Sequence, residues 1–209
     1  DNELITTYFQ RNSQLLATYK GNNSGTDLES ELRSHTDYDY SRTSTISDIA
    51  MPATPGINKR YYYFNQSHSA TYNQVFRVGK NGELGINAAY LNDRDERSNQ
   101  SVTTTLLPDG SKNVVDESFN GILHRNIANG NITYMQNTER NYIKEQLKFD
   151  WLSTDGYSNI YAGEDIIQEN NVENYRLHNL FHLTSRTGSD KGVEFLSKIN
   201  LEKKPHSLS

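Results

Sequence analysis

Hydrophobic and polar residues alternate with a period of two along much of the chain. The clearest alternating segments span residues 70–78, 83–90, 142–151, 174–183 and 193–201. Because successive side chains of a β-strand point to opposite faces, this period predicts strands that have one apolar and one polar face. With weaker segments near the N-terminus and around Ile132, the pattern predicts an all-β fold, an antiparallel meander of about eight to ten strands.

The connectors between the predicted strands have two lengths. Compact turns are predicted at residues 79–82, 136–141 and 185–192, and long polar loops at residues 21–58, 92–118 and 153–171. Inside the second loop, Asp109-Gly110 has the turn chemistry of a β-ribbon formed by residues 102–115. Short turns on one side and long loops on the other are typical of an outer-membrane β-barrel, so we interpret residues 1–209 as a single barrel segment.

Periodicity alone does not tell which face of each strand points outward. In an outer-membrane barrel the apolar face meets lipid and the polar face lines a wet lumen. In a soluble β-sandwich the apolar faces of two sheets pack together and the polar faces meet solvent. The second arrangement would suit a carbohydrate-binding or adhesion module, and it stays open as the alternative function.

Composition narrows the class of protein further. Only 33% of residues are hydrophobic, which excludes a thick buried core, while the 14 Tyr, 7 Phe and 1 Trp argue against a disordered chain. A net charge of -5 offers no basic field, so nucleic acid is not expected as a partner. Cys is absent, which excludes disulfides and thiolate chemistry. The longest apolar or aromatic run, residues 61–64, is too short for a transmembrane helix but leaves transmembrane strands open.

No catalytic motif is present, and we expect no enzyme activity, no cofactor and no metal site. His178 and His182 lie four residues apart, about 13 Å along a strand, and would not share a metal ion. A glycosidase would need a carboxylate pair, and the sequence singles out none. The expected function is therefore ligand binding, with candidate residues on the polar strand faces and in the predicted loops: Asn73, Arg77, Asn87, Lys148, Arg176 and His178 on strands, and Tyr38, Asp95 and Tyr161 in loops.

The stretch from Pro52 to Asp93 carries a family resemblance. Its two most informative pieces are residues 55–69, which begin Pro55-Gly56-Ile57-Asn58, and residues 85–93, which begin Gly85-Ile86-Asn87. They resemble the barrel of Bacteroidetes TonB-dependent receptors that carry an N-terminal carboxypeptidase-regulatory-like domain. The ending, residues 203–209, resembles a strand-loop junction of the same barrels.

The resemblance implies a protein of the bacterial outer membrane that imports a nutrient ligand with energy relayed through TonB. Its implied partners are outer-membrane lipid, the TonB system acting through a plug region, and an unidentified nutrient. Such barrels have 22 strands and a plug, whereas this sequence has neither, so we expect an internal fragment of a larger protein. A partial barrel has two unpaired edges, so the isolated fragment is expected to form an edge-paired homodimer or to collapse into a sandwich.

Overall fold

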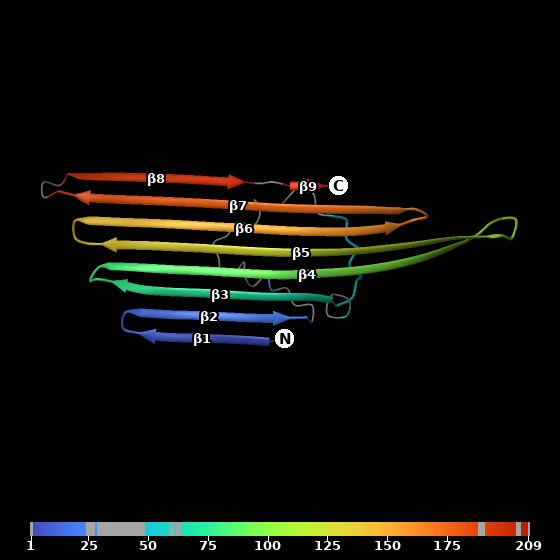
Figure 1. The fold of residues 1–209 in the computed structure, drawn as a ribbon, viewed down its shortest axis with the longest axis horizontal. Coiled ribbons are helices and arrows are strands. Elements are labelled where there is room, and N and C mark those ends of the chain that lie inside the picture. Colours follow the sequence, from blue (N-terminus) through green and yellow to red (C-terminus); the bar gives the residue numbers. More distant parts are fainter. Residues whose placement is uncertain are drawn as a thin grey trace.

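The computed structural model describes residues 2–23, 28, 49–58, 61, 64–187, 191–203 and 206–208. These residues form one antiparallel sheet of nine strands, shown in Figure 1 as a single layer. Eight strands follow one another in chain order, and the ninth pairs with β7. Their bounds are β1 Asn2–Gln10, β2 Ser13–Asn22, β3 Phe64–Val78, β4 Gly82–Leu106, β5 Lys112–Asn137, β6 Asn141–Tyr161, β7 Asp165–Arg186, β8 Gly192–Lys203 and β9 His206–Leu208.

The sheet confirms the predicted all-β antiparallel meander. Its short connections β1–β2, β3–β4, β5–β6 and β7–β8 all lie at one end, at the left of Figure 1. The β3–β4 turn contains Gly79, whose positive φ of 66° is a conformation that glycine adopts without strain. No helix among the described residues is long and apolar enough to span a bilayer. We call the end of the sheet that holds the four short connections the turn side, and the opposite end the tip side.

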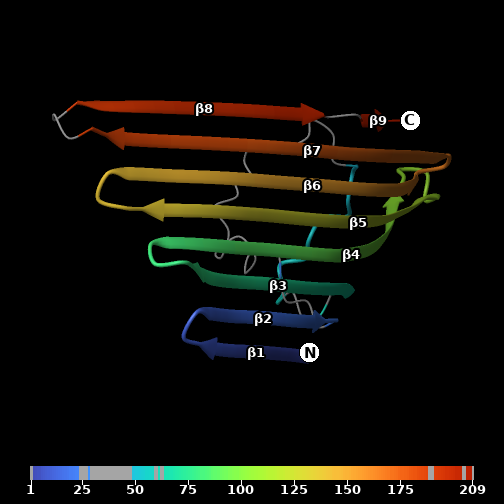
Figure 2. The same ribbon diagram turned by 60° about the vertical axis from the view of Figure 1, so that its left-hand side comes forward.

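Two of the three predicted loops are wrong. Residues 92–118 belong to β4 and β5, which continue as a hairpin to the turn at residues 107–111, and residues 153–171 belong to β6 and β7. Figure 1 shows the β4–β5 hairpin projecting beyond its neighbours on the tip side, and Figure 2 shows the end of β4 bending out of the line of the other strands. The predicted ribbon at residues 102–115 is its outer part. Both segments are mostly polar, so no apolar alternation marks their strands in the sequence. The strands pair through the backbone ladder, and polar side chains such as Asp95 and Ser158 are buried in them. Most of the third loop, residues 21–58, lies outside the described residues.

The register assigns every strand residue to one of two faces. One face carries the even-numbered residues of β1, β3, β4 and β5 and the odd-numbered residues of β2, β6, β7 and β8. We call it the apolar face, because it collects the apolar half of each alternating segment. The other side is the polar face. Residues directly opposite one another on successive strands form cross-strand rows that run perpendicular to the strands.

A small core lies against the polar face on the tip side. Leu28 packs there with Ala89, Leu91 and Ile127, all of them buried. Residues 49–58 cross the strands over the same region, at the right in both ribbon views. Ile49 sits on Gly156, where a Cβ would lie 2.9 Å from the Ile49 side chain. Described residues therefore cover the tip half of the polar face, and none of the described segments crosses its turn half, which we call the open half.

Candidate functional site

The open half of the polar face presents a continuous row of hydrogen-bonding side chains. Amide and cationic groups follow one another across six strands, from β3 to β8, a width of about 24 Å at the usual strand spacing. Four of the predicted site residues, Asn73, Asn87, Lys148 and His178, fall in this row. Asn131 and Asn200 complete it, which gives the order Asn73, Asn87, Asn131, Lys148, His178, Asn200.

A second polar row runs beside the first, two residues nearer the tip side. It holds the predicted residue Arg176, whose guanidinium lies 2.9 Å from the Glu202 carboxylate. Asp150 is opposite Arg176, and its Oδ1 accepts a hydrogen bond of 3.2 Å from Asn129 Nδ2. Together the two rows form a mixed field of amides, cations and carboxylates, which can bind polar ligands through many weak contacts.

The remaining predicted residues lie elsewhere. Arg77 is on the polar face at the turn end of β3, four residues from Asn73, and is exposed. Tyr161 is at the tip end of β6 on the apolar face, 41% exposed, and does not join the polar rows. Tyr38 lies outside the described residues. The expectation that Tyr161 belongs to a loop is wrong, because β6 runs to that residue.

Asp95 is also misplaced by the sequence prediction. It was expected in a loop, but it lies within β4 on the polar face and is only 2% exposed. Arg97 binds its carboxylate with two contacts, Nε to Oδ1 at 3.2 Å and a second nitrogen to Oδ2 at 2.6 Å. Two residues away, Asp93 accepts a hydrogen bond from Ser67 and lies 3.6 Å from Arg125. Asp95 therefore belongs to a buried ionic network with a structural role.

The covering segment was not predicted from the sequence. Ala50 N donates a hydrogen bond of 3.2 Å to Gln168 Oε1, and Met51 and Pro52 lie over Gly121. Glycine inside a strand often marks a close approach by another part of the chain, so Gly121 and Gly156 carried a usable signal. The two glycines identify the covering segment only when the register of the strands is known, because the register places both of them under residues 49–52.

On the apolar face, two rows of aromatic residues lie about 20 Å apart along the strands, six residues at the usual rise. The tip-side aromatic row contains Tyr19, Tyr90, Trp151 and Tyr175, separated by Ala70 and Ala128. The turn-side aromatic row contains Phe76, Tyr134 and Phe181. We call the surface bounded by these rows the apolar zone. Many of its side chains are exposed, among them Tyr72 at 39%, Leu147 at 38% and Phe149 at 41%.

The polar atoms of the Tyr and Trp residues in the two aromatic rows point away from the apolar zone. On the tip side, the Tyr19 hydroxyl is hydrogen-bonded to His68 at 2.8 Å, and the Tyr90 hydroxyl donates to Asn126 at 2.9 Å.

Trp151 Nε1 donates to Glu173 at 3.4 Å, and the Tyr175 hydroxyl donates to the same carboxylate. The three partners, His68, Asn126 and Glu173, share the next row toward the tips.

On the turn side, the Tyr134 hydroxyl donates in the opposite direction, to Gln136 at 3.2 Å. Glu145 also lies in the turn-side row, where it accepts a hydrogen bond from Asn179. The zone therefore has a polar margin at each end, and the aromatic rings face inward from both margins.

Within the described ranges, no three His, Asp or Glu side chains gather as metal ligands. The chain matches no protein-family model, and comparison with curated proteins gives no match either. The function is therefore argued from the two faces of the sheet.

Proposed function

We propose that this chain is part of a TonB-dependent receptor of the bacterial outer membrane, which captures a nutrient ligand and imports it. In this proposal the apolar face meets lipid and the polar face lines the lumen. The observation that carries it is that the Tyr and Trp side chains of the tip-side row direct their polar atoms toward the tips, whereas the Tyr134 hydroxyl of the turn-side row points toward the turns. Tyr and Trp take this orientation at membrane interfaces, with the ring in hydrocarbon and the polar atom toward water.

The dimensions of the apolar zone support the proposal. The alternating segments of β3 (70–78), β6 (143–151) and β7 (175–183) each run for nine residues, about 27 Å at the usual rise. On the apolar face each segment carries four apolar side chains and one polar side chain, which is Gln74, Glu145 or Asn179. A tilted transmembrane strand needs about 9–11 residues. The exposed zone also spans eight strands, whereas soluble monomers rarely expose apolar patches beyond about 300–600 Å². If the zone faces lipid instead of water, its exposed apolar area carries no cost in free energy.

The polar rows supply the proposed ligand contacts. Asn73, Asn87, Lys148 and His178 would face the lumen together, with Arg176 in the next row, and a passing ligand would exchange hydrogen bonds along this surface. The part of the proposal in which TonB relays energy through a plug region rests on the family resemblance described above. Catalysis plays no part in this proposal.

The soluble alternative, a β-sandwich that binds carbohydrate, requires a second sheet over the apolar zone. The described residues form one sheet, and the segment that crosses it, residues 49–58, lies on the polar face. This arrangement does not favour the sandwich. We further propose that two copies of the fragment, when it is produced alone, pair with each other through the outer strands β1 and β8.

Spin labelling of β7 tests the proposal. The sequence has no Cys, so single cysteines can be introduced at each position from 175 to 183 in the full-length gene product, reconstituted in lipid vesicles. Odd positions should be accessible to oxygen, which dissolves in lipid, and even positions to a water-soluble nickel reagent. Adjacent positions control for one another. Odd positions closed to both reagents would indicate a sandwich interior and refute the membrane proposal.

A further inference from the structure

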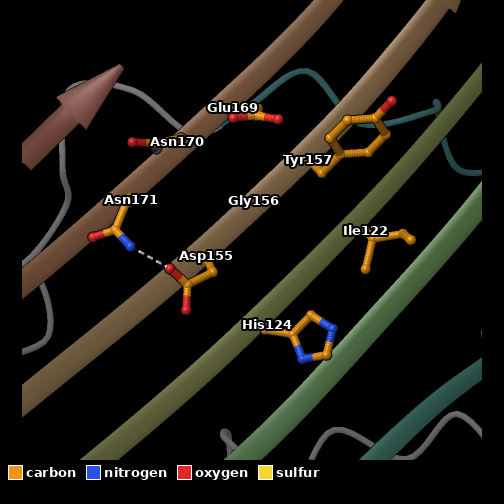
Figure 3. A pocket seen from close by; sticks show the side chains of 8 residues that line it. All are labelled: Ile122, His124, Asp155, Gly156, Tyr157, Glu169, Asn170 and Asn171. Carbon is orange, nitrogen blue, oxygen red and sulfur yellow. Dashed lines mark hydrogen bonds between the residues drawn. The ribbon is translucent and has the colours of Figure 1, made fainter. Parts of the chain in front are cut away.

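A shallow pocket lies on the apolar face beyond the tip-side aromatic row. Its volume is about 420 Å³, and β5, β6 and β7 contribute its walls. Figure 3 shows the side chains of His124, Asp155 and Asn171 in one part and those of Ile122, Tyr157 and Glu169 in the other. These six residues occupy two adjacent cross-strand rows. The pocket is distinct from the proposed lumen surface, which lies on the other face.

The level of the pocket limits what can occupy it. Along β6, Asp155 and Tyr157 lie four and six residues beyond Trp151, about 13 and 20 Å at the usual rise. A strand tilt of about 45° still leaves about 9 Å between the aromatic row and the nearer edge of the pocket. A phospholipid headgroup layer adds only about 5–8 Å to each side of the hydrocarbon core. A compact headgroup therefore does not reach the pocket, whereas an extended sugar chain does.

The chemistry of the pocket favours a ligand that donates hydrogen bonds. Asp155 and Glu169 present carboxylates, and Asn171 Nδ2 donates to Asp155 Oδ1 at 2.5 Å, which fixes that carboxylate in place. An ionised carboxylate only accepts hydrogen bonds, so sugar hydroxyls suit it and phosphate oxygens do not.

The surroundings add to this preference. Arg94, directly opposite His124, is paired with Glu96 at 3.2 Å, so its charge is already compensated. Ile122 and the ring of Tyr157, which is 39% exposed, supply an apolar surface of the kind that a sugar ring covers. Polar groups that converge around such a surface are characteristic of small-molecule sites.

We propose that this pocket binds the uncharged sugar headgroup of a glycolipid, whose acyl chains lie along the apolar zone below it. The proposal rests on the proposed function, because the acyl chains require a lipid-facing apolar zone. The bound lipid would belong to the leaflet on the tip side. It would be held from two directions, by hydroxyl contacts in the pocket and by hydrocarbon contacts beneath the aromatic row.

The test uses the full-length gene product in nanodiscs of phosphatidylcholine. The probes are digalactosyl diacylglycerol, an uncharged glycolipid; phosphatidylglycerol, an anionic phospholipid; and free digalactosylglycerol, which lacks acyl chains. Retention of each lipid is measured by native mass spectrometry, and affinity by titration. Tyr157→Ala and the milder Asp155→Asn remove pocket contacts. Asp116→Asn is the matched control, because Asp116 is an exposed carboxylate on the same face outside the pocket.

We expect the glycolipid to be retained selectively, and each pocket variant to weaken its binding about tenfold, the effect of losing roughly one good contact. Asp116→Asn should bind like the unmodified protein. Equal retention of phosphatidylglycerol, or unchanged binding by both pocket variants, overturns the proposal. If free digalactosylglycerol binds as tightly as the glycolipid, the claim that the acyl chains contribute to binding is overturned. If the glycolipid fails while the β7 labelling pattern is as expected, this inference fails and the membrane proposal survives.

Discussion

Leu147 offers a direct measurement of what surrounds the apolar zone. It lies on β6 between Ile132 and Asn179 and is 38% exposed. It is four residues from Trp151 and two from Glu145, so the nearer margin is about 7 Å away along the strand. In lipid, Leu147→Arg should cost about 2 kcal/mol, between the midplane and interface values for transmembrane barrels. That is roughly a 30-fold change in the folding equilibrium, at about 1.4 kcal/mol per tenfold.

The matched control is Gln146→Arg, one residue away on the polar face of the same strand. A cation at this position would face a wet lumen, so the expected cost is only that of the hydrogen bond from Gln146 Nε2 to Asn131 Oδ1, at most about 1 kcal/mol and well below the cost of Leu147→Arg. Both variants are made in the full-length gene product, and the free energy of unfolding is measured by urea titration in lipid vesicles. A negligible cost for Leu147→Arg would mean that the residue faces water. That result would refute the assignment of the apolar face to lipid.

Three further predictions concern the tip side. Arg97→Met should destabilise the protein by about 3 kcal/mol in urea titration, because it leaves the buried Asp95 carboxylate without its partner. Gly156→Val should lower stability by about 1–3 kcal/mol and make residues 49–58 more sensitive to protease, because the new side chain would overlap Ile49. Asp109 has a pKa below its usual range, since the Ser111 side chain and backbone donate hydrogen bonds to its carboxylate; Ser111→Ala should raise that pKa in an NMR titration.

Each of these predictions has a control or a contrary outcome. Arg94→Met breaks an exposed ion pair with Glu96 and should cost under about 1 kcal/mol; an equal cost for the two Arg variants would contradict the buried network. Gly130→Ala meets no atom within 4 Å and should leave residues 49–58 protected. For Asp109, the lowered pKa stabilises the hairpin turn above the ordinary carboxyl pKa, and this contribution is lost as pH falls through the folded value. An acid transition of the turn that Ser111→Ala leaves unchanged would contradict this.

The sequence predicted the strands where alternation was complete. Residues 70–78 and 83–90 became paired strands joined by the predicted glycine turn, because alternate burial and turn chemistry agree there. The same alternation placed Asn73, Lys148 and His178 on one face, but the chain alone gave no register. Their common row, and its completion by Asn131, depend on how many residues each turn takes up.

The misplaced elements have physical reasons too. Residues 98–106 carry only two apolar side chains, Val102 and Leu106, so no regular alternation marks them as a strand. Their partner strand holds them through backbone hydrogen bonds. The sequence predicts Asp95 in a loop as a ligand-binding residue, whereas it lies buried within β4. Its burial depends on Arg97 and on packing across the polar face, and neither can be read from local spacing.

The two outermost strands set a condition on how the sheet can enter a bilayer. Among the strands that the structure describes, β1 pairs only with β2, so about half of its nine residues direct their amide and carbonyl groups outward. Each such group costs several kcal/mol where no water is present, which amounts to tens of kcal/mol for one such strand. An open sheet of eight strands, with two unpaired edges, is therefore not stable in the hydrocarbon of a bilayer. The apolar zone can face lipid only when β1 and β8 are each paired with a further strand. Pairing of these two edge strands therefore has to accompany insertion into the bilayer.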